Sequence, residues 1–113
     1  MLYTTITINN NEYKLRLNAK ASVELEKRLG KNPLNVLMEL SEHNLPSVET
    51  IVTILHSALQ AYQHGFSMDD TYDLYDKMVD EGMSLETILP MIVEIFKVSG
   101  YIKTEESKAD GKN

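Results

Sequence analysis

Three histidines are the residues of this chain best suited to hold a metal ion, because it contains no cysteine. His56 and His64 are eight positions apart, which on one helix separates them by more than about 10 Å. A helical pair of metal ligands uses a spacing of three or four residues instead. His43 lies in a separate linker. We therefore expect all three at the surface or at helix ends, and we expect neither a metal site nor a cofactor.

A run of acidic residues begins at Asp69 and superficially matches the composition of a calcium-binding loop. It lacks the glycine and the glutamate that such a loop needs at its sixth and twelfth positions. At 100° per residue, four acidic side chains share one narrow helix face, namely Asp69, Asp73, Asp76 and Asp80. The sequence therefore predicts a solvated acidic face, without the apolar pocket that raises the pKa of a catalytic carboxyl group.

Nucleophilic chemistry is not indicated either. Ser47, Ser67 and Ser84 each stand where a helix needs an N-terminal cap. The chain has no Gly-rich phosphate loop, no nucleophile elbow and no Ser-x-x-Lys sequence. We therefore expect a protein that is not an enzyme and has no catalytic residue.

The composition predicts one globular domain, because 113 residues with 42% hydrophobic and 25% charged side chains can build a single core. The absence of cysteine fits a reducing cytoplasm. No apolar run is long enough to span a bilayer, and the first residues lack the pattern of a signal peptide. We expect a soluble protein without a membrane partner.

Charge is distributed unevenly along the chain, whose net charge is −6. Residues 1–32 carry a net charge of +3, from six basic and three acidic side chains, whereas residues 33–102 carry −9, from two basic and eleven acidic ones. An acidic surface repels phosphate backbones, so we expect no nucleic-acid partner. A basic protein partner fits this surface better.

The elements that must carry these residues follow from periodicity and caps. Alternating apolar residues predict a β-hairpin over residues 2–17, with Asn9, Asn10 and Asn11 as its turn. Helical periodicity and cap residues predict five helices, over residues 19–29, 33–41, 47–64, 67–81 and 84–98. Pro90 predicts either a kink or a helix that begins at this proline. The predicted fold class is mainly α (α+β), in a single domain over residues 1–102 with a disordered tail over 103–113.

The helix over 84–98 is apolar on most of its sides, which is typical of a central or an interfacial helix. Together with the apolar face of the helix over 47–64, it could form a groove for an amphipathic partner helix. Methionines such as Met38, which is assigned to a buried helix face, fill a core or line such a groove. The candidate partner-binding residues are Ile51, Leu55, Leu59, Tyr62, Ile88, Ile92, Ile95 and Phe96.

An ordered series of short segments resembles the tail assembly chaperones of long-tailed phages that infect Gram-positive bacteria. The segments extend over about residues 2 to 102 and are Leu15-Arg16-Leu17, the run Glu24-Leu25-Glu26-Lys27-Arg28-Leu29-Gly30, Asn32-Pro33-Leu34, the run Ile54-Leu55-His56-Ser57-Ala58-Leu59-Gln60, His64-Gly65 and Val98-Ser99-Gly100-Tyr101. The resemblance implies a non-enzymatic assembly factor of the siphovirus or prophage type.

What the resemblance implies further is a client, the long helical tape-measure protein. Chaperones of this kind keep it soluble until tail-tube subunits polymerise around it. The implied location is the cytoplasm of the host bacterium, and the protein is expected to be absent from the mature virion. A basic N-terminal segment on an acidic molecule is also compatible with a homo-oligomer.

Such families often make a longer form by −1 ribosomal frameshifting, which could contact the tail-tube protein. The codons of Gly111-Lys112-Asn113 could contain a slippery heptamer, although the same tripeptide recurs at Gly30-Lys31-Asn32. Two alternatives remain open. One is a structural head-tail connector or completion protein, and the other is an acidic host-directed protein that binds through the face of Asp69.

Overall fold

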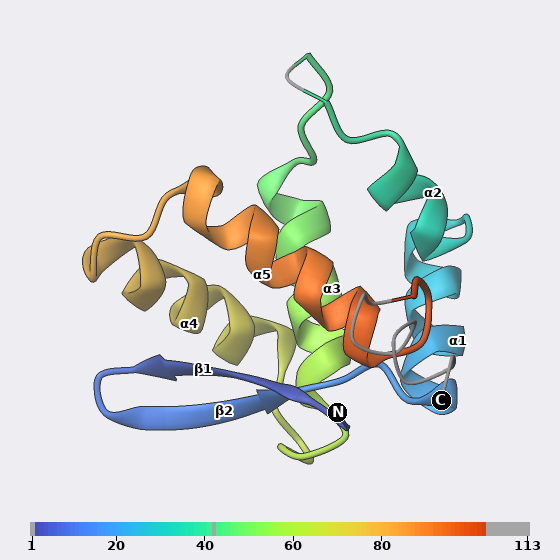
Figure 1. Ribbon diagram of the computed structural model, residues 1–113. Coiled ribbons are helices and arrows are strands. Elements are labelled where there is room, and N and C mark those ends of the chain that lie inside the picture. The colour runs from blue at the N-terminus through green and yellow to red at the C-terminus, as the bar shows by residue number, and fades with distance from the viewer. Residues whose placement is uncertain (1, 42, 104–113) are drawn as a thin grey trace, which may run out of the picture.

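A two-stranded antiparallel hairpin and five helices make up residues 2–41 and 43–103, which are the residues that the computed structural model describes (Figure 1). The predicted fold class, a mainly helical domain with an N-terminal hairpin, is confirmed. The elements are β1 (Thr4–Ile8), β2 (Asn11–Leu15), α1 (Ala19–Leu29), α2 (Pro33–Met38), α3 (Val48–Leu59), α4 (Met68–Asp80) and α5 (Leu85–Val98). Of the tail predicted over 103–113, only Lys103 lies within the described residues.

The hairpin turns on two asparagines rather than three. Asn9 and Asn10 have φ values of 52° and 68°, a left-handed conformation that asparagine tolerates well. Asn11 is already part of β2, where it pairs with Ile8. The turn is held against the rest of the molecule because the backbone N–H of Asn9 donates to the carboxylate of Glu81, at 2.7 Å.

Two helices end earlier than predicted, because side-chain amides bind backbone carbonyls just beyond them. α2 stops at Met38, and Asn44 Nδ2 donates to the carbonyl of Glu39 at 2.7 Å. α3 stops at Leu59, where Gln60 Nε2 donates to the carbonyl of Phe66, also at 2.7 Å. In both cases the hydrogen bond draws the chain into a turn that replaces the last predicted helical turns.

Pro90 lies inside α5, which runs as one helix from Leu85 to Val98. The proline neither starts the helix nor divides it. It is exposed, so its ring is on the solvent side and the opposite side of the helix remains free to pack.

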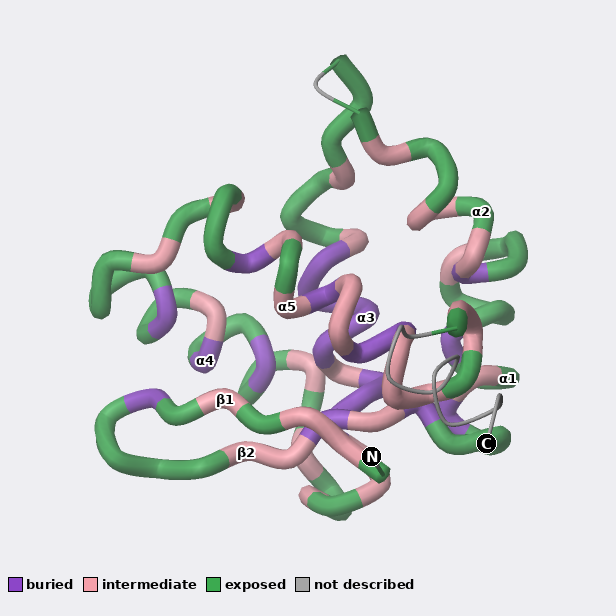
Figure 2. The backbone as a smooth tube through the Cα atoms, viewed as in Figure 1, coloured by how far each residue is buried: buried purple, intermediate pink, exposed green. Residues whose placement is uncertain are grey.

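α3 is the central element of the core. It contacts α1, α4, α5 and β2, and Figure 2 shows the buried residues concentrated along it. Eight of its twelve residues are buried, whereas α1 and α4 each bury only one face. Each leucine or isoleucine that becomes fully buried contributes roughly 1.5–3 kcal/mol, so α3 and the helices around it carry most of the stability.

Candidate functional site

The predicted groove for a partner helix does not exist in this structure. Seven of the eight candidate residues are core residues, with exposures of 0 to 3%; they are Ile51, Leu55, Leu59, Ile88, Ile92, Ile95 and Phe96. The prediction is wrong because the apolar faces of α3 and α5 cover each other where the two helices cross (Figure 1). Exposing only four of these side chains would cost about 6–12 kcal/mol, comparable to the free energy of unfolding of a whole domain.

Tyr62 is the one candidate residue that remains at the surface. It lies after α3, outside the helix that was predicted to carry it, and is 38% exposed. Its ring packs edge-on against Tyr3, at 5.4 Å between centroids, and the ammonium group of Lys14 lies 5.7 Å from its centroid. Tyr62 therefore attaches the segment after α3 to the hairpin instead of extending a groove.

Apolar side chains are exposed elsewhere, in the segment that joins α2 to α3. Met38 is 75% exposed, Leu45 51% and Val48 46%. Met38 was assigned to a buried helix face, and that prediction is wrong as well. Because α2 has only six residues and the chain leaves the body of the molecule after it, its far end has no neighbouring element to pack against (Figure 1).

One of these side chains, Leu45, lines a shallow pocket of about 200 Å³. Its apolar lining consists of Leu29, Val36, Leu40, Leu45 and Pro46. An ion pair between Lys31 and Glu39, at 3.3 Å, lies among its polar lining residues. We call Met38, Val48 and the lining residues Val36, Leu40, Leu45 and Pro46 the α2–α3 surface. It combines an apolar centre with a charged rim, which is the usual build of a protein-binding patch.

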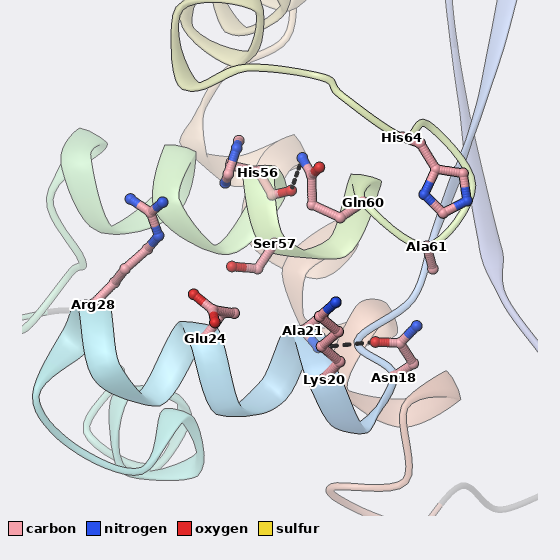
Figure 3. A pocket seen from close by; sticks show the side chains of 10 residues that line it. All are labelled: Asn18, Lys20, Ala21, Glu24, Arg28, His56, Ser57, Gln60, Ala61 and His64. Atoms are coloured by element: carbon pink, nitrogen blue, oxygen red, sulfur yellow. Dashed lines mark hydrogen bonds between the residues drawn. The ribbon is translucent and has the colours of Figure 1, made fainter.

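A second pocket, of about 380 Å³, is lined by residues of α1 and α3 and of the segments next to them (Figure 3). Glu24 and Arg28 extend from α1 and Ser57 from α3, while Asn18 caps α1 by accepting a hydrogen bond from the backbone N–H of Ala21 at 2.9 Å. The pocket therefore contains a negative charge, from Glu24, and a positive charge, from Arg28. A polar group of a peptide or a small molecule could be held there by hydrogen bonds.

His56 lines the same pocket and is its most unusual residue. Its Nδ1 atom is buried and has no hydrogen-bond partner among the described atoms. Burial lowers the pKa of His56 below its usual 6.5, the nearby positive charge of Arg28 lowers it further, and a backbone hydrogen bond at Phe66 partly opposes both. His56 is therefore mostly neutral at pH 7. Among the described residues, no hydrogen bond joins it to Ser57 or Glu24, so a nucleophile and its base are not paired here.

Comparison with known proteins gives a family. Residues 2–113 match the one described as "Family of unknown function (DUF6096)". The chain belongs to DUF6096. No curated protein and no solved structure matches it.

The acidic face of this DUF6096 protein lies where the sequence predicts it. Asp69, Asp73, Asp76 and Asp80 are all exposed on α4, opposite the buried Leu74 and Met78. Within residues 2–41 and 43–103, no group of three histidine or acidic side chains is arranged to hold a metal ion. In the same part of the chain, no helix is long and apolar enough to cross a membrane.

The sequence reasoning missed the α2–α3 surface of the DUF6096 protein. A signal was present at Leu45, which precedes Pro46 in a linker between two helices and belongs to no amphipathic pattern. Large apolar residues at positions that no helix face requires are candidates for binding. Overall apolar content instead pointed to α5, where the apolar residues form the core.

Proposed function

We propose that this protein is a non-enzymatic phage tail assembly chaperone, which binds the tape-measure protein in the host cytoplasm and keeps it soluble for tail-tube polymerisation. The ordered sequence resemblance over about residues 2 to 102 motivates the choice of client. The observation that carries the binding function is the α2–α3 surface, where three large apolar side chains from a segment of eleven residues are exposed.

The α2–α3 surface suits a long helical client in shape and chemistry. An amphipathic helix can lay an apolar residue into the pocket beside Leu45 while its neighbours cover Met38 and Val48. A shallow pocket with a small apolar centre gives modest affinity, and a chaperone that must leave its client needs such affinity. The net charge of −6 favours a client with basic segments and raises the rate of encounter with it.

Co-expression with the tape-measure protein of the same phage or prophage tests this function. We expect the wild-type chain to keep the tape-measure protein in the soluble fraction and to be recovered with it. Leu45→Asp combined with Val48→Asp should lower recovery about tenfold or more, because carboxylates in an apolar contact leave charges without water or a partner.

Val23→Asp provides the matched control. Val23 is 47% exposed, nearly the same as Val48, but it lies on α1, outside the α2–α3 surface. We expect it to bind as the wild type does, with circular dichroism confirming that every variant is folded. Equal binding by the double variant would place the client on another surface. Failure of the wild-type chain to bind or to solubilise the tape-measure protein would refute the function itself.

The exposed acidic face of α4 favours a second candidate function, a host-directed protein that binds a basic DNA-binding protein. Such binding would weaken steeply with salt and would be lost when Asp73→Asn and Asp76→Asn neutralise the face. The remaining alternative, a connector or completion protein, predicts that the chain is found in purified mature particles, from which a chaperone is absent.

A further inference from the structure

One edge of the hairpin is a free strand. Ile8 and Asn11 flank the two-residue turn and form the first hydrogen-bonded pair of the ladder. Because such pairs alternate with non-hydrogen-bonded ones in an antiparallel ladder, the N–H and C=O groups of Thr5 and Thr7 point away from β2. No hydrogen bond within the described part of the chain uses these groups, and both threonines are exposed. β1 therefore presents unpaired backbone donors and acceptors.

The other edge, that of β2, is flanked by the segment after α3. Tyr62 contacts Tyr3 on one face of the hairpin, and Phe66 contacts Tyr13 on the opposite face, at 6.1 Å between centroids. A segment that touches both faces within five residues passes around either an edge or the open end of the hairpin. Figure 1 shows it beside β2, whereas β1 has α5 as a neighbour. Within the described residues, the backbone groups without a partner are those on the outer side of β1, at Thr5 and Thr7.

β1 also lacks the features that protect an edge strand from pairing. Residues 2–8 contain no charged residue and no proline, whereas β2 carries Glu12 and Lys14. Charged side chains and prolines are the usual means of preventing association at an edge. Leu2, just before β1, is 69% exposed and lies on the same face of the hairpin as the core residue Ile8.

We propose that β1 pairs antiparallel with β1 of a second copy of this chain, about a two-fold axis at Thr5. The two hairpins then form one four-stranded sheet with the order β2-β1-β1-β2. Thr5 lies opposite Thr5 of the copy, Tyr3 opposite Thr7, and Thr4 opposite Ile6. Leu2 lies opposite Ile8, and its exposed side chain becomes partly buried there.

A second copy fits this edge better than a different partner does, because the segment complements itself. The pairs that residues 3–7 make about Thr5 combine β-branched or aromatic side chains, which favour each other across strands. Pairing through β1 also avoids contact between like charges. Two copies that each carry a charge of −6 repel one another, and the uncharged segment 2–8 allows contact without placing like charges opposite each other.

A single-cysteine experiment tests the pairing and its register, since the chain contains no cysteine of its own. Across the two-fold axis, the Cα atoms of a Thr5 pair lie about 5.5 Å apart, within the range of a disulfide. The two copies of Thr7 would be separated by four residues of strand, about 13 Å, which no disulfide spans. We expect Thr5→Cys to form a disulfide-linked dimer under mild oxidation and Thr7→Cys to remain monomeric on a non-reducing gel.

Sedimentation of the full chain tests the dimer without a crosslink. Thr5→Lys places two ammonium groups opposite each other and should raise the dissociation constant of the dimer about tenfold or more. Asn11→Lys makes the same change of charge at an exposed position of β2 and should leave the dimer intact.

Three results would overturn the proposal. The first is a wild-type chain that is monomeric up to about 0.1 mM, which corresponds to a negligible affinity. The second is equal dissociation by Thr5→Lys and Asn11→Lys in folded protein. The third is a disulfide that forms as readily through Thr7→Cys as through Thr5→Cys. None of these results bears on binding of the tape-measure protein through the α2–α3 surface.

Discussion

The surroundings of His56 affect how the stability of the whole protein depends on pH. Burial and Arg28 lower its pKa, and its buried Nδ1 atom has no hydrogen-bond partner in the part of the chain that the structure describes. When this ring is protonated in the folded state, its positive charge is partly removed from water and is repelled by the guanidinium group of Arg28. The folded protein therefore binds that proton less readily than the unfolded chain does.

This difference predicts a loss of stability in mildly acidic solution. Well above pH 6.5, His56 is neutral in both states and has no effect. As the pH falls below 6.5, the unfolded chain takes up the proton first, so the free energy of unfolding decreases until the pH passes the lower pKa of the folded state. Urea unfolding of the wild type at pH 7.5 and 5.5 should show the loss, and His56→Gln should show a smaller one.

His64→Gln is the control for this measurement, because His64 lies at the rim of the same pocket but is exposed. An unchanged pH dependence in His56→Gln would mean that burial of the ring does not govern its protonation.

At the scale of elements, local hydrogen bonds decide where each helix begins and ends. α1 spans the predicted residues 19–29, since Asn18 caps its start and Gly30 adopts the left-handed conformation that ends it. α4 starts with a complete capping box. The Ser67 hydroxyl accepts from the N–H of Asp70, and the Asp70 carboxylate accepts from the N–H of Ser67. Hydrogen bonds from the Ser67 N–H, and then from its hydroxyl, lower the pKa of Asp70.

Two serines at equivalent positions provide a matched test of capping. Ser67→Ala removes the cap of α4 and should lower the free energy of unfolding by about 1 kcal/mol. Ser84 precedes α5 but makes no side-chain capping bond, so Ser84→Ala should cost much less. Urea denaturation of both variants gives the comparison, and equal losses would show that the Ser67 bonds contribute little.

At the scale of the whole molecule, one core joins elements that are distant in sequence. Phe96 of α5 is fully buried, packs edge-on against Tyr101 and belongs to the same cluster as Leu15 of β2 and Leu55 of α3. The apolar surface that was predicted to bind a client is thus covered by the protein itself. The two proposed binding sites, the α2–α3 surface and the β1 edge, lie at the periphery.

Phe96→Ala tests the role of α5 as a core helix. The cavity and the lost apolar burial should lower the free energy of unfolding by about 3–5 kcal/mol, measured by urea or thermal denaturation. Met38→Ala, at a side chain that is 75% exposed, should change it by less than about 0.5 kcal/mol. A small loss for Phe96→Ala would mean that α5 is not packed as described and that its apolar face is available after all.

The helices and strands of this protein were predictable from the amino-acid sequence, because the signals for them are local. Alternation predicted the hairpin, cap residues predicted the helix starts, and the 100° spacing of Asp69 and Asp73 predicted an acidic face that is indeed exposed on α4. Each signal depends on neighbours within about one helical turn or one pair of strands. It can therefore be recognised without knowing how distant parts of the chain pack.

Which apolar faces are covered depends on how the helices pack, and this was not predictable from the sequence. The faces of α3 and α5 look equally suited to a core and to a groove, because an apolar stripe does not specify what lies against it. α5 covers α3, so Ile92 and Phe96 became core, while the six-residue α2 left Met38 without a neighbour. The candidate binding surface therefore depends on packing between segments far apart in the chain, which no local pattern records.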